Sequence, residues 1–235
     1  MLKKILKNKF LGRVDVINKI LKYNKGKSYL EIGVRRGETI AQIEASNRIG
    51  VDPNLQLDRI AILKSKGNLD GVEFLEIPSD RFFQENTRTF DVIFIDGLHL
   101  YEQAIKDILN ALNVLNEGGY IVVHDCNPMT EKAADRKQAK GIWSGDVWKS
   151  IYDIKINYPE IDYFVLNKDY GLGILSKKNG NENNYVPKFD ENISNLDFSF
   201  LERNRNDILN LKDVKYFRNK FGDKGIWSKI KNNIS

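Results

Sequence analysis

Short apolar runs alternate with segments of helical periodicity along most of this 235-residue chain, and this alternation limits its fold more than any other feature. The predicted strands lie at residues 28–33, 49–52, 72–76, 90–95 and 120–123, and the predicted helices between them at 39–46, 55–65, 80–85 and 101–115. Strands that are nearly all apolar are typical of a parallel sheet buried between two layers of helices. We therefore expect an α/β protein with a doubly wound sheet and helices on both faces.

The alternation ends after Asp125. A polar loop over residues 126–146 precedes a helix and two further strands, which are joined by only four residues, 167–170. Four residues are too few for a crossover helix, so these two strands must pair antiparallel. We expect a seven-stranded sheet, mostly parallel, with an antiparallel last strand. The predicted organisation is an N-terminal helical segment (1–27), a ligand-binding domain (28–178) and a flexible linker with a helical C-terminal extension (179–235).

The composition narrows the class of partner. Lysine and arginine give a net charge of +5, but the basic residues are dispersed, so no nucleic-acid partner is expected. No apolar run approaches the roughly 20 residues that span a bilayer, which argues against stable membrane insertion. Cys126 is the only cysteine, so no disulfide can form within the chain, and we expect a cytoplasmic protein. The chain could form a homodimer, and a monomer is equally compatible with its sequence.

The only two histidines each stand close to an aspartate at the end of a predicted strand. One strand runs into Asp96-Gly97-Leu98-His99 and another into His124-Asp125. Neighbouring parallel strands deliver their carboxyl ends to one edge of the sheet, where ligands bind. We therefore expect these four polar side chains to meet in one site.

A glycine turn follows the first strand, in the segment Glu31-Ile32-Gly33-Val34-Arg35-Arg36-Gly37. A dinucleotide-binding turn would need glycine at positions 33, 35 and 38, and this chain has arginine at 35 and glutamate at 38. Both side chains disfavour a pyrophosphate. The turn suits a ligand that has no phosphate and some positive charge, such as S-adenosylmethionine.

Two further strand ends carry residues suited to the same ligand. Asp52 lies 19 residues after Gly33, where an acid contacts ribose hydroxyls in doubly wound folds. Ser79 and Asp80 follow the third strand and could face an adenine ring. The alternatives are structural, because Asp52 could form a turn before Pro53 and Ser79 could cap a helix.

Over roughly residues 28–176 the chain resembles the class I S-adenosylmethionine-dependent methyltransferases, which have a Rossmann-like sheet. It looks like the branch with small-molecule and sugar O-methyltransferases and relatives named as cephalosporin hydroxylases. The motifs that carry the resemblance are Glu31-Ile32-Gly33 with Gly37, Val51-Asp52-Pro53, Ile95-Asp96-Gly97-Leu98-His99-Leu100-Tyr101, and Gly118-Gly119-Tyr120 with His124-Asp125. The resemblance implies a cofactor site made of Glu31, Gly33, Gly37, Asp52, Ser79, Asp80 and Asp96.

The resemblance also implies a reaction and roles within it. We expect an O-methyltransferase that acts on a hydroxyl of a sugar, a nucleotide-linked sugar or another polar small molecule. His99 is the expected general base, with Asp96 and His124 as further catalytic residues. Metal-dependent relatives bind Mg²⁺ through acids at these strand ends, which assigns Asp96 and Asp125 to a metal here. Some of those relatives have a second acid where this chain has His124, so the sequence is compatible with both a metal-dependent and a metal-independent enzyme.

Other interpretations of the same residues remain at this stage. His99 could cap a helix, and Asp125 could form a turn that stabilises the following loop. The whole protein could be a nicotinamide-dependent oxidoreductase, which Arg35 argues against, or a non-catalytic binding protein with the same fold. In the long loop, Trp143 is a candidate for a lid over the site, whereas Trp148 on the next helix is expected in the core.

Overall fold

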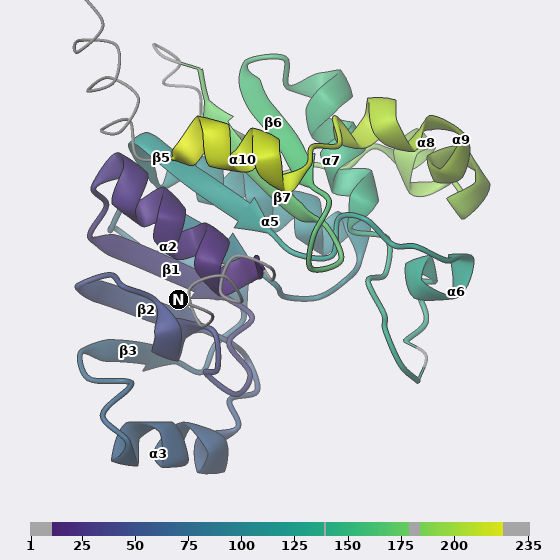
Figure 1. Cartoon of the computed structure of the whole chain (residues 1–235). Coiled ribbons are helices and arrows are strands. Elements are labelled where there is room, and N and C mark those ends of the chain that lie inside the picture. Colours follow the sequence, from purple (N-terminus) through teal and green to yellow (C-terminus); the bar gives the residue numbers. More distant parts are fainter. Residues whose placement is uncertain (1–10, 139, 179–183, 223–235) are drawn as a thin grey trace, which may run out of the picture.

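The computed structural model describes residues 11–138, 140–178 and 184–222, which form a seven-stranded sheet with helices on both faces (Figure 1). The strand order is β3-β2-β1-β4-β5-β7-β6, and β7 runs antiparallel to both of its neighbours. The predicted Rossmann-like sheet with an antiparallel last strand is therefore confirmed. The strands are β1 (Ser28–Ile32), β2 (Asn47–Val51), β3 (Val72–Leu75), β4 (Phe90–Ile95), β5 (Leu115–Val123), β6 (Ile161–Leu166) and β7 (Leu172–Lys177).

Each face of the sheet has its own apolar core, because successive side chains of a strand point to opposite faces. In β4, Val92 and Phe94 belong to one core, and Ile93 and Ile95 belong to the other. Helices α2 and α10 lie against the first face and α5 against the second (Figure 1). The helices are α2 (Arg13–Asn24), the 3₁₀ turn η1 (Ile40–Gln42), α3 (Leu57–Ser65), α4 (Ser79–Glu85), α5 (Tyr101–Asn113), α6 (Glu131–Ala134), α7 (Trp148–Asn157), α8 (Glu191–Ser194), α9 (Phe198–Leu209) and α10 (Val214–Phe221).

The helix predicted over residues 39–46 was wrong. Only the 3₁₀ turn Ile40–Gln42 forms there, and the chain is extended again at Ile43. Asn18 of α2 explains the difference, because its side chain donates to the carbonyl of Gln42 and accepts from the amide of Glu44. These tertiary hydrogen bonds satisfy backbone groups that a helix would have paired internally.

Both ends of the described chain pack onto the sheet domain. Within the N-terminal helical segment predicted over residues 1–27, α2 forms at Arg13–Asn24, and residues 1–10 lie outside the described residues. Towards the C-terminus, α9 packs against α7 and buries Leu201 and Leu209. Trp148 is buried, as predicted for a core residue. No helix in the described ranges is long and apolar enough to cross a membrane.

The register of the strands sets the position of the site. Ile32 pairs with Val51 on one side and with Ile95 on the other, and Ile95 pairs with Val123. The residue that follows each of these strand ends therefore lies at the same edge of the sheet. Those residues are Gly33, Asp52, Asp96 and His124.

Candidate functional site

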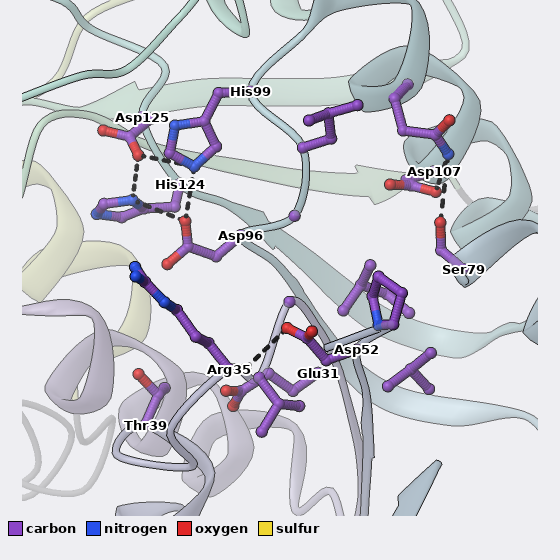
Figure 2. Close-up of a pocket in the computed structure, with 18 of the residues that line it drawn as sticks. Glu31, Arg35, Thr39, Asp52, Ser79, Asp96, His99, Asp107, His124 and Asp125 are labelled. Atoms are coloured by element: carbon purple, nitrogen blue, oxygen red, sulfur yellow. Dashed lines mark hydrogen bonds and ion pairs between the residues drawn. The ribbon is translucent and has the colours of Figure 1, made fainter. Parts of the chain in front are cut away.

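A cleft of about 760 Å³ lies at the carboxyl ends of β1, β2, β4 and β5 (Figure 2). This is the edge at which doubly wound sheets bind ligands, and the volume suits a small-molecule site. Every predicted site residue except Gly37 lines it. The lining residues with predicted roles are Glu31, Gly33, Asp52, Ser79, Asp80, Asp96, His99, His124 and Asp125.

The glycine turn brings β1 and β4 into close contact. Gly33 has a φ of +91°, and a Cβ atom there would lie 2.0 Å from the carbonyl oxygen of Asp96. Only glycine can adopt this positive φ without strain and also leave room for the carbonyl of Asp96. Gly37 has a φ of +76°, but its Cα faces Ile60 and Leu63 of α3 rather than the cleft. Gly37 therefore shapes the turn and does not line the predicted cofactor site.

Glu31 and Asp52 stand on either side of this turn. Glu31 is fully buried and accepts a hydrogen bond of 2.7 Å from the hydroxyl of Tyr29. Burial raises the pKa of Glu31 to about 8, even though the Tyr29 hydrogen bond acts to lower that pKa. Asp52 accepts from the backbone amides of Arg35 and Asn54 at 2.8 and 2.7 Å. These two bonds fix the carboxylate of Asp52 at the mouth of the cleft (Figure 2).

The residues after β3 lie at the other side of the cleft. Nε2 of Gln103 in α5 lies within hydrogen-bond distance of three acceptors, Oγ of Ser79, Oδ1 of Asp80 and Oδ1 of Asp107, at 3.2, 3.1 and 3.0 Å. Asp80 is also paired with Lys106 at 2.6 Å. Asp107 and Gln103 also line the cleft and were not predicted. Gln103 lies in the first turn of α5 and Asp107 in the second, and neither position gives a signal in the sequence.

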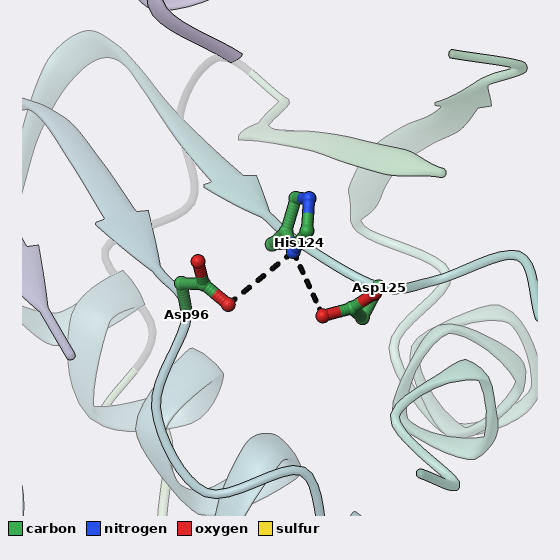
Figure 3. A group of neighbouring side chains, drawn as sticks. All are labelled: Asp96, His124 and Asp125. Atoms are coloured by element: carbon green, nitrogen blue, oxygen red, sulfur yellow. Dashed lines mark hydrogen bonds and ion pairs between the residues drawn. The ribbon is translucent and has the colours of Figure 1, made fainter. Parts of the chain in front are cut away.

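The two aspartates and two histidines predicted to meet do lie together, at the ends of β4 and β5. They are Asp96, His99, His124 and Asp125. Nδ1 of His124 lies 2.8 Å from Oδ2 of Asp125 and 3.3 Å from Oδ1 of Asp96 (Figure 3). Nε2 of His99 lies 3.4 Å from Asp96 and 3.5 Å from Asp125. One ligand atom from each of Asp96, His124 and Asp125 falls within 4.8 Å of the others, which is close enough to share a metal ion.

Two further charged residues belong to this group and were missed. Arg13, the first residue of α2, donates to Oδ2 of Asp96 at 2.6 Å. Arg13 also holds Asp169 through both of its carboxylate oxygens, at 3.0 and 3.1 Å. Asp169 in turn lies 3.3 Å from Nε2 of His124. The turn between β6 and β7 ends at the same sheet edge, which is a usable signal for Asp169, whereas the sequence gives none for Arg13.

These contacts shift the acids and histidines in opposite directions. Burial acts to raise the pKa of Asp96, but hydrogen bonds from His124 and His99 and the charge of Arg13 hold that pKa well below its usual range. Burial acts to lower the pKa of each histidine, but the carboxylates outweigh it and raise the pKa of His99 and, further, that of His124. The group is therefore a set of three carboxylates facing an arginine and two readily protonated imidazoles.

The loop after β5 closes over His99. The carbonyl of Trp143 lies 3.0 Å from Nδ1 of His99, and the two rings stack at 4.8 Å. Gly145 allows this contact, because a Cβ atom there would lie 1.9 Å from the carbonyl oxygen of His99. The hydroxyl of Ser144 donates to Oδ1 of Asp125 at 2.8 Å. The loop thus orients His99 and Asp125 together.

A known protein family matches the part of the chain that contains these strand ends. A model described as a methyltransferase domain matches residues 30–126. No curated protein matches the chain at the significance required.

Solved structures share the fold at low identity. A Podospora anserina methyltransferase bound to S-adenosylhomocysteine (PaMTH1) is 19% identical, with a TM-score of 0.55, over 73% of this chain and 81% of that one. A Bacillus cereus O-methyltransferase in complex with S-adenosylhomocysteine is 15% identical, with a TM-score of 0.52, over 70% and 80%. TomG of Streptomyces achromogenes, an O-methyltransferase of tomaymycin synthesis in complex with S-adenosylmethionine, is 13% identical, with a TM-score of 0.52, over 69% and 77%.

The family match and the fold agree with the resemblance inferred from the sequence. A methyltransferase-domain model thus matches residues 30–126, and the sheet that contains these residues has the Rossmann-like fold of the solved methyltransferases.

Proposed function

We propose that this protein transfers the methyl group of S-adenosylmethionine to a hydroxyl of a sugar or another polar small molecule. The observation that carries the proposal is the continuity of one cleft, which is lined at one side by Asp52 and at the other by His99. A cofactor held along the strand ends would therefore share its cavity with a group able to accept a proton.

The residues of the cleft fit the cofactor. S-adenosylmethionine supplies a methyl group that its sulfonium sulfur makes electrophilic. The cleft offers acids for the positive amino and sulfonium groups, a bare glycine at position 33, and a carboxylate for ribose hydroxyls. We assign Glu31 and Gly33 to the methionine part, Asp52 to the ribose, and Ser79 and Asp80 to the adenine.

His99 is the proposed general base. Its Nδ1 atom faces the carbonyl of Trp143, which can only accept a hydrogen bond, so Nδ1 carries the proton. Nε2 faces the cleft beside Asp96 and Asp125, and because these carboxylates outweigh burial and raise the pKa of His99, the neutral form with its lone pair on Nε2 is favoured as the pH rises. A hydroxyl bound there would pass its proton to Nε2 of His99. His124 has carboxylates at both ring nitrogens, which suits an orienting role better than proton transfer.

We also propose that Asp96 and Asp125 can hold a divalent cation, with His124 beside them. The donor set, two carboxylates and one imidazole, fits Mn²⁺ or Mg²⁺, and Mg²⁺ keeps most of its ligands as water. A cation there would lower the pKa of a bound hydroxyl, so the hydroxyl would lose its proton to His99 more easily.

The lining of the cleft supports a polar acceptor. Arg36, Glu38, Thr39 and Gln138 line the cleft, and the side chain of Arg35 extends from the glycine turn towards Asp96 (Figure 2). Guanidinium groups bind phosphates and carboxylates. A sugar, or a nucleotide-linked sugar whose phosphate meets Arg35, would satisfy these polar groups.

The test is transfer of a labelled methyl group to a panel of sugars, nucleotide-linked sugars, catechols and amines. The proposal predicts an O-methylated sugar product, identified by mass spectrometry. Parallel reactions with Mn²⁺ and with a chelator test the cation. Methylation of amines alone, or of catechols alone, would contradict the proposed acceptor. Equal rates of methyl transfer with and without a chelator would contradict the proposed role of a cation at Asp96 and Asp125.

A further inference from the structure

The positive charge of the chain is concentrated in two helices and in the terminal segments that adjoin them in sequence. Residues 13–25 and 212–222, which contain α2 and α10, and the segments 1–10 and 223–235 together hold 15 basic and 3 acidic residues. The rest of the chain holds 22 basic and 29 acidic residues. The net charge of +5 therefore divides into +12 for these four segments and −7 for the remainder.

Helices α2 and α10 form one continuous surface. They lie side by side on the same face of the sheet (Figure 1), and the ring centroid of Phe221 in α10 lies 5.1 Å from that of Tyr23 in α2. Phe217 and Phe221 are buried in the core of that face, so the opposite side of α10 faces outward. We call the outward side of the two helices the basic surface. Its exposed basic residues are Lys22, Lys25, Lys215 and Arg218.

The basic surface also carries aromatic rings. Tyr23 and Tyr216 are 36% and 39% exposed. The two aspartates of these helices are engaged with the backbone, because Asp15 accepts from the amide of Gly12 and Asp213 accepts from the amide of Tyr216. Exposed tyrosines among lysines are typical of surfaces that meet the headgroup region of a bilayer, where an aromatic ring can be half buried.

The terminal segments have the same mixture of positive charge and large apolar residues. Residues 1–10 contain four lysines among Leu2, Ile5, Leu6 and Phe10, and residues 223–235 contain three lysines among Ile226, Trp227 and Ile230. Such a mixture is typical of segments that bind an anionic bilayer surface. A nucleic acid needs the positive charge but offers its phosphates no use for the apolar side chains. The composition therefore favours a membrane as the partner.

We propose that the basic surface of α2 and α10 docks on a bilayer that contains anionic phospholipids, with the terminal segments adding to its positive charge. Each lysine or arginine close to such a bilayer tightens binding by about fivefold, and the acidic remainder of the chain is repelled from it. The inference does not depend on the proposed function, because Arg13 is the only residue of α2 or α10 that lines the cleft in the described ranges.

The experiment is co-sedimentation of the full chain with two kinds of vesicle, phosphatidylcholine alone and equal parts of phosphatidylcholine and phosphatidylglycerol. The protein should bind the anionic vesicles at least about tenfold more tightly than the neutral ones. Binding to the anionic vesicles should weaken by at least about tenfold between about 0.1 M and about 1 M salt, because the screening length falls from about 10 Å to about 3 Å.

The double variant Lys25→Gln/Lys215→Gln removes one exposed charge from each helix and should bind the anionic vesicles about 10- to 30-fold more weakly. The matched control is Lys66→Gln/Lys132→Gln. It gives the same net charge by changing exposed lysines at the end of α3 and in α6, away from the basic surface (Figure 1). The control should stay within about threefold of the wild-type affinity.

Equal binding of the two kinds of vesicle by wild-type protein would overturn the proposal. Equal weakening in the two double variants would overturn it too, because total charge rather than the basic surface would then decide binding. Tighter binding to a DNA duplex of about 20 base pairs than to the anionic vesicles, weakened by Lys25→Gln/Lys215→Gln, would assign the surface to nucleic acid instead.

Discussion

Nη1 of Arg13 donates to Oδ2 of Asp96 at 2.6 Å, so the first residue of the N-terminal helix holds an acid at the end of β4. The same guanidinium holds Asp169 from the β6–β7 turn. One side chain therefore joins three parts of the chain that are far apart in sequence. Its removal would leave two largely buried carboxylates without this counter-charge.

Arg13→Met should lower the free energy of unfolding at pH 7 by about 2 kcal/mol, between the values for exposed pairs and for broken buried pairs. Hydrogen bonds and charge hold the pKa values of Asp96 and Asp169 below the ordinary value. The stabilisation is therefore present above about pH 4 and is lost as the pH falls further. Urea unfolding at several pH values checks this.

The control for Arg13 is Arg81→Met, which breaks an exposed pair with Glu85. It should change the free energy of unfolding by less than about 1 kcal/mol. Equal losses in the two variants at pH 7 would show that the Arg13 contacts contribute no more than a surface ion pair.

Glu31 should make the protein less stable as the pH rises. Burial raises its pKa to about 8 in the folded state, whereas an unfolded glutamate titrates near about 4.3. The folded state binds one more proton between these values, so stability falls by up to about 1.4 kcal/mol per pH unit as the pH rises from about 5 to about 8. Glu31→Gln should remove this part of the slope. Parallel stability curves for the two proteins would be evidence against it.

Gly33→Ala tests the close contact between β1 and β4, with Gly118→Ala as its control. Both glycines have positive φ, but an added Cβ meets the Asp96 carbonyl at position 33 and nothing within 4 Å at position 118. Gly118→Ala should therefore lose about 1–2 kcal/mol, the conformational penalty alone. Gly33→Ala should lose at least about 3 kcal/mol or fail to fold. Similar losses at both positions would mean that the turn relaxes easily.

His99→Ala should lower kcat for methyl transfer by a factor of about 10² or more, the usual contribution of a general base. Affinity for S-adenosylhomocysteine should stay within about threefold, because His99 is assigned to the acceptor side of the cleft. The measurements are steady-state kinetics with the acceptor found in the panel and calorimetry with the product. A normal kcat in this variant would leave His99 a structural role only.

Most of the fold could be predicted because the apolar strands are strong local signals. The four-residue link 167–170 was enough to fix the antiparallel β7. The helix predicted at 39–46 failed because contacts from Asn18, which lies in another helix, decided the local backbone. Helix propensity depends on the local sequence alone, so it does not include a contact with a residue of another helix.

The site was predictable where it depends on strand ends and unpredictable where it depends on packing. Asp52, Asp96 and His124 follow paired strands, so one topological rule brings them together. Arg13 and Asp107 lie on helices, and their approach to the cleft depends on how α2 and α5 pack against the sheet. Nothing in the sequence near either residue distinguishes it from a surface position.

The most direct measurement is calorimetric titration of the wild-type protein and Asp52→Ala with S-adenosylhomocysteine. The proposed function predicts one site per chain, with affinity at least about tenfold weaker in Asp52→Ala, because the carboxylate that contacts the ribose is lost. If wild-type protein showed no binding at millimolar ligand, or if Asp52→Ala bound as tightly as wild type, the cleft at these strand ends would not be the cofactor site.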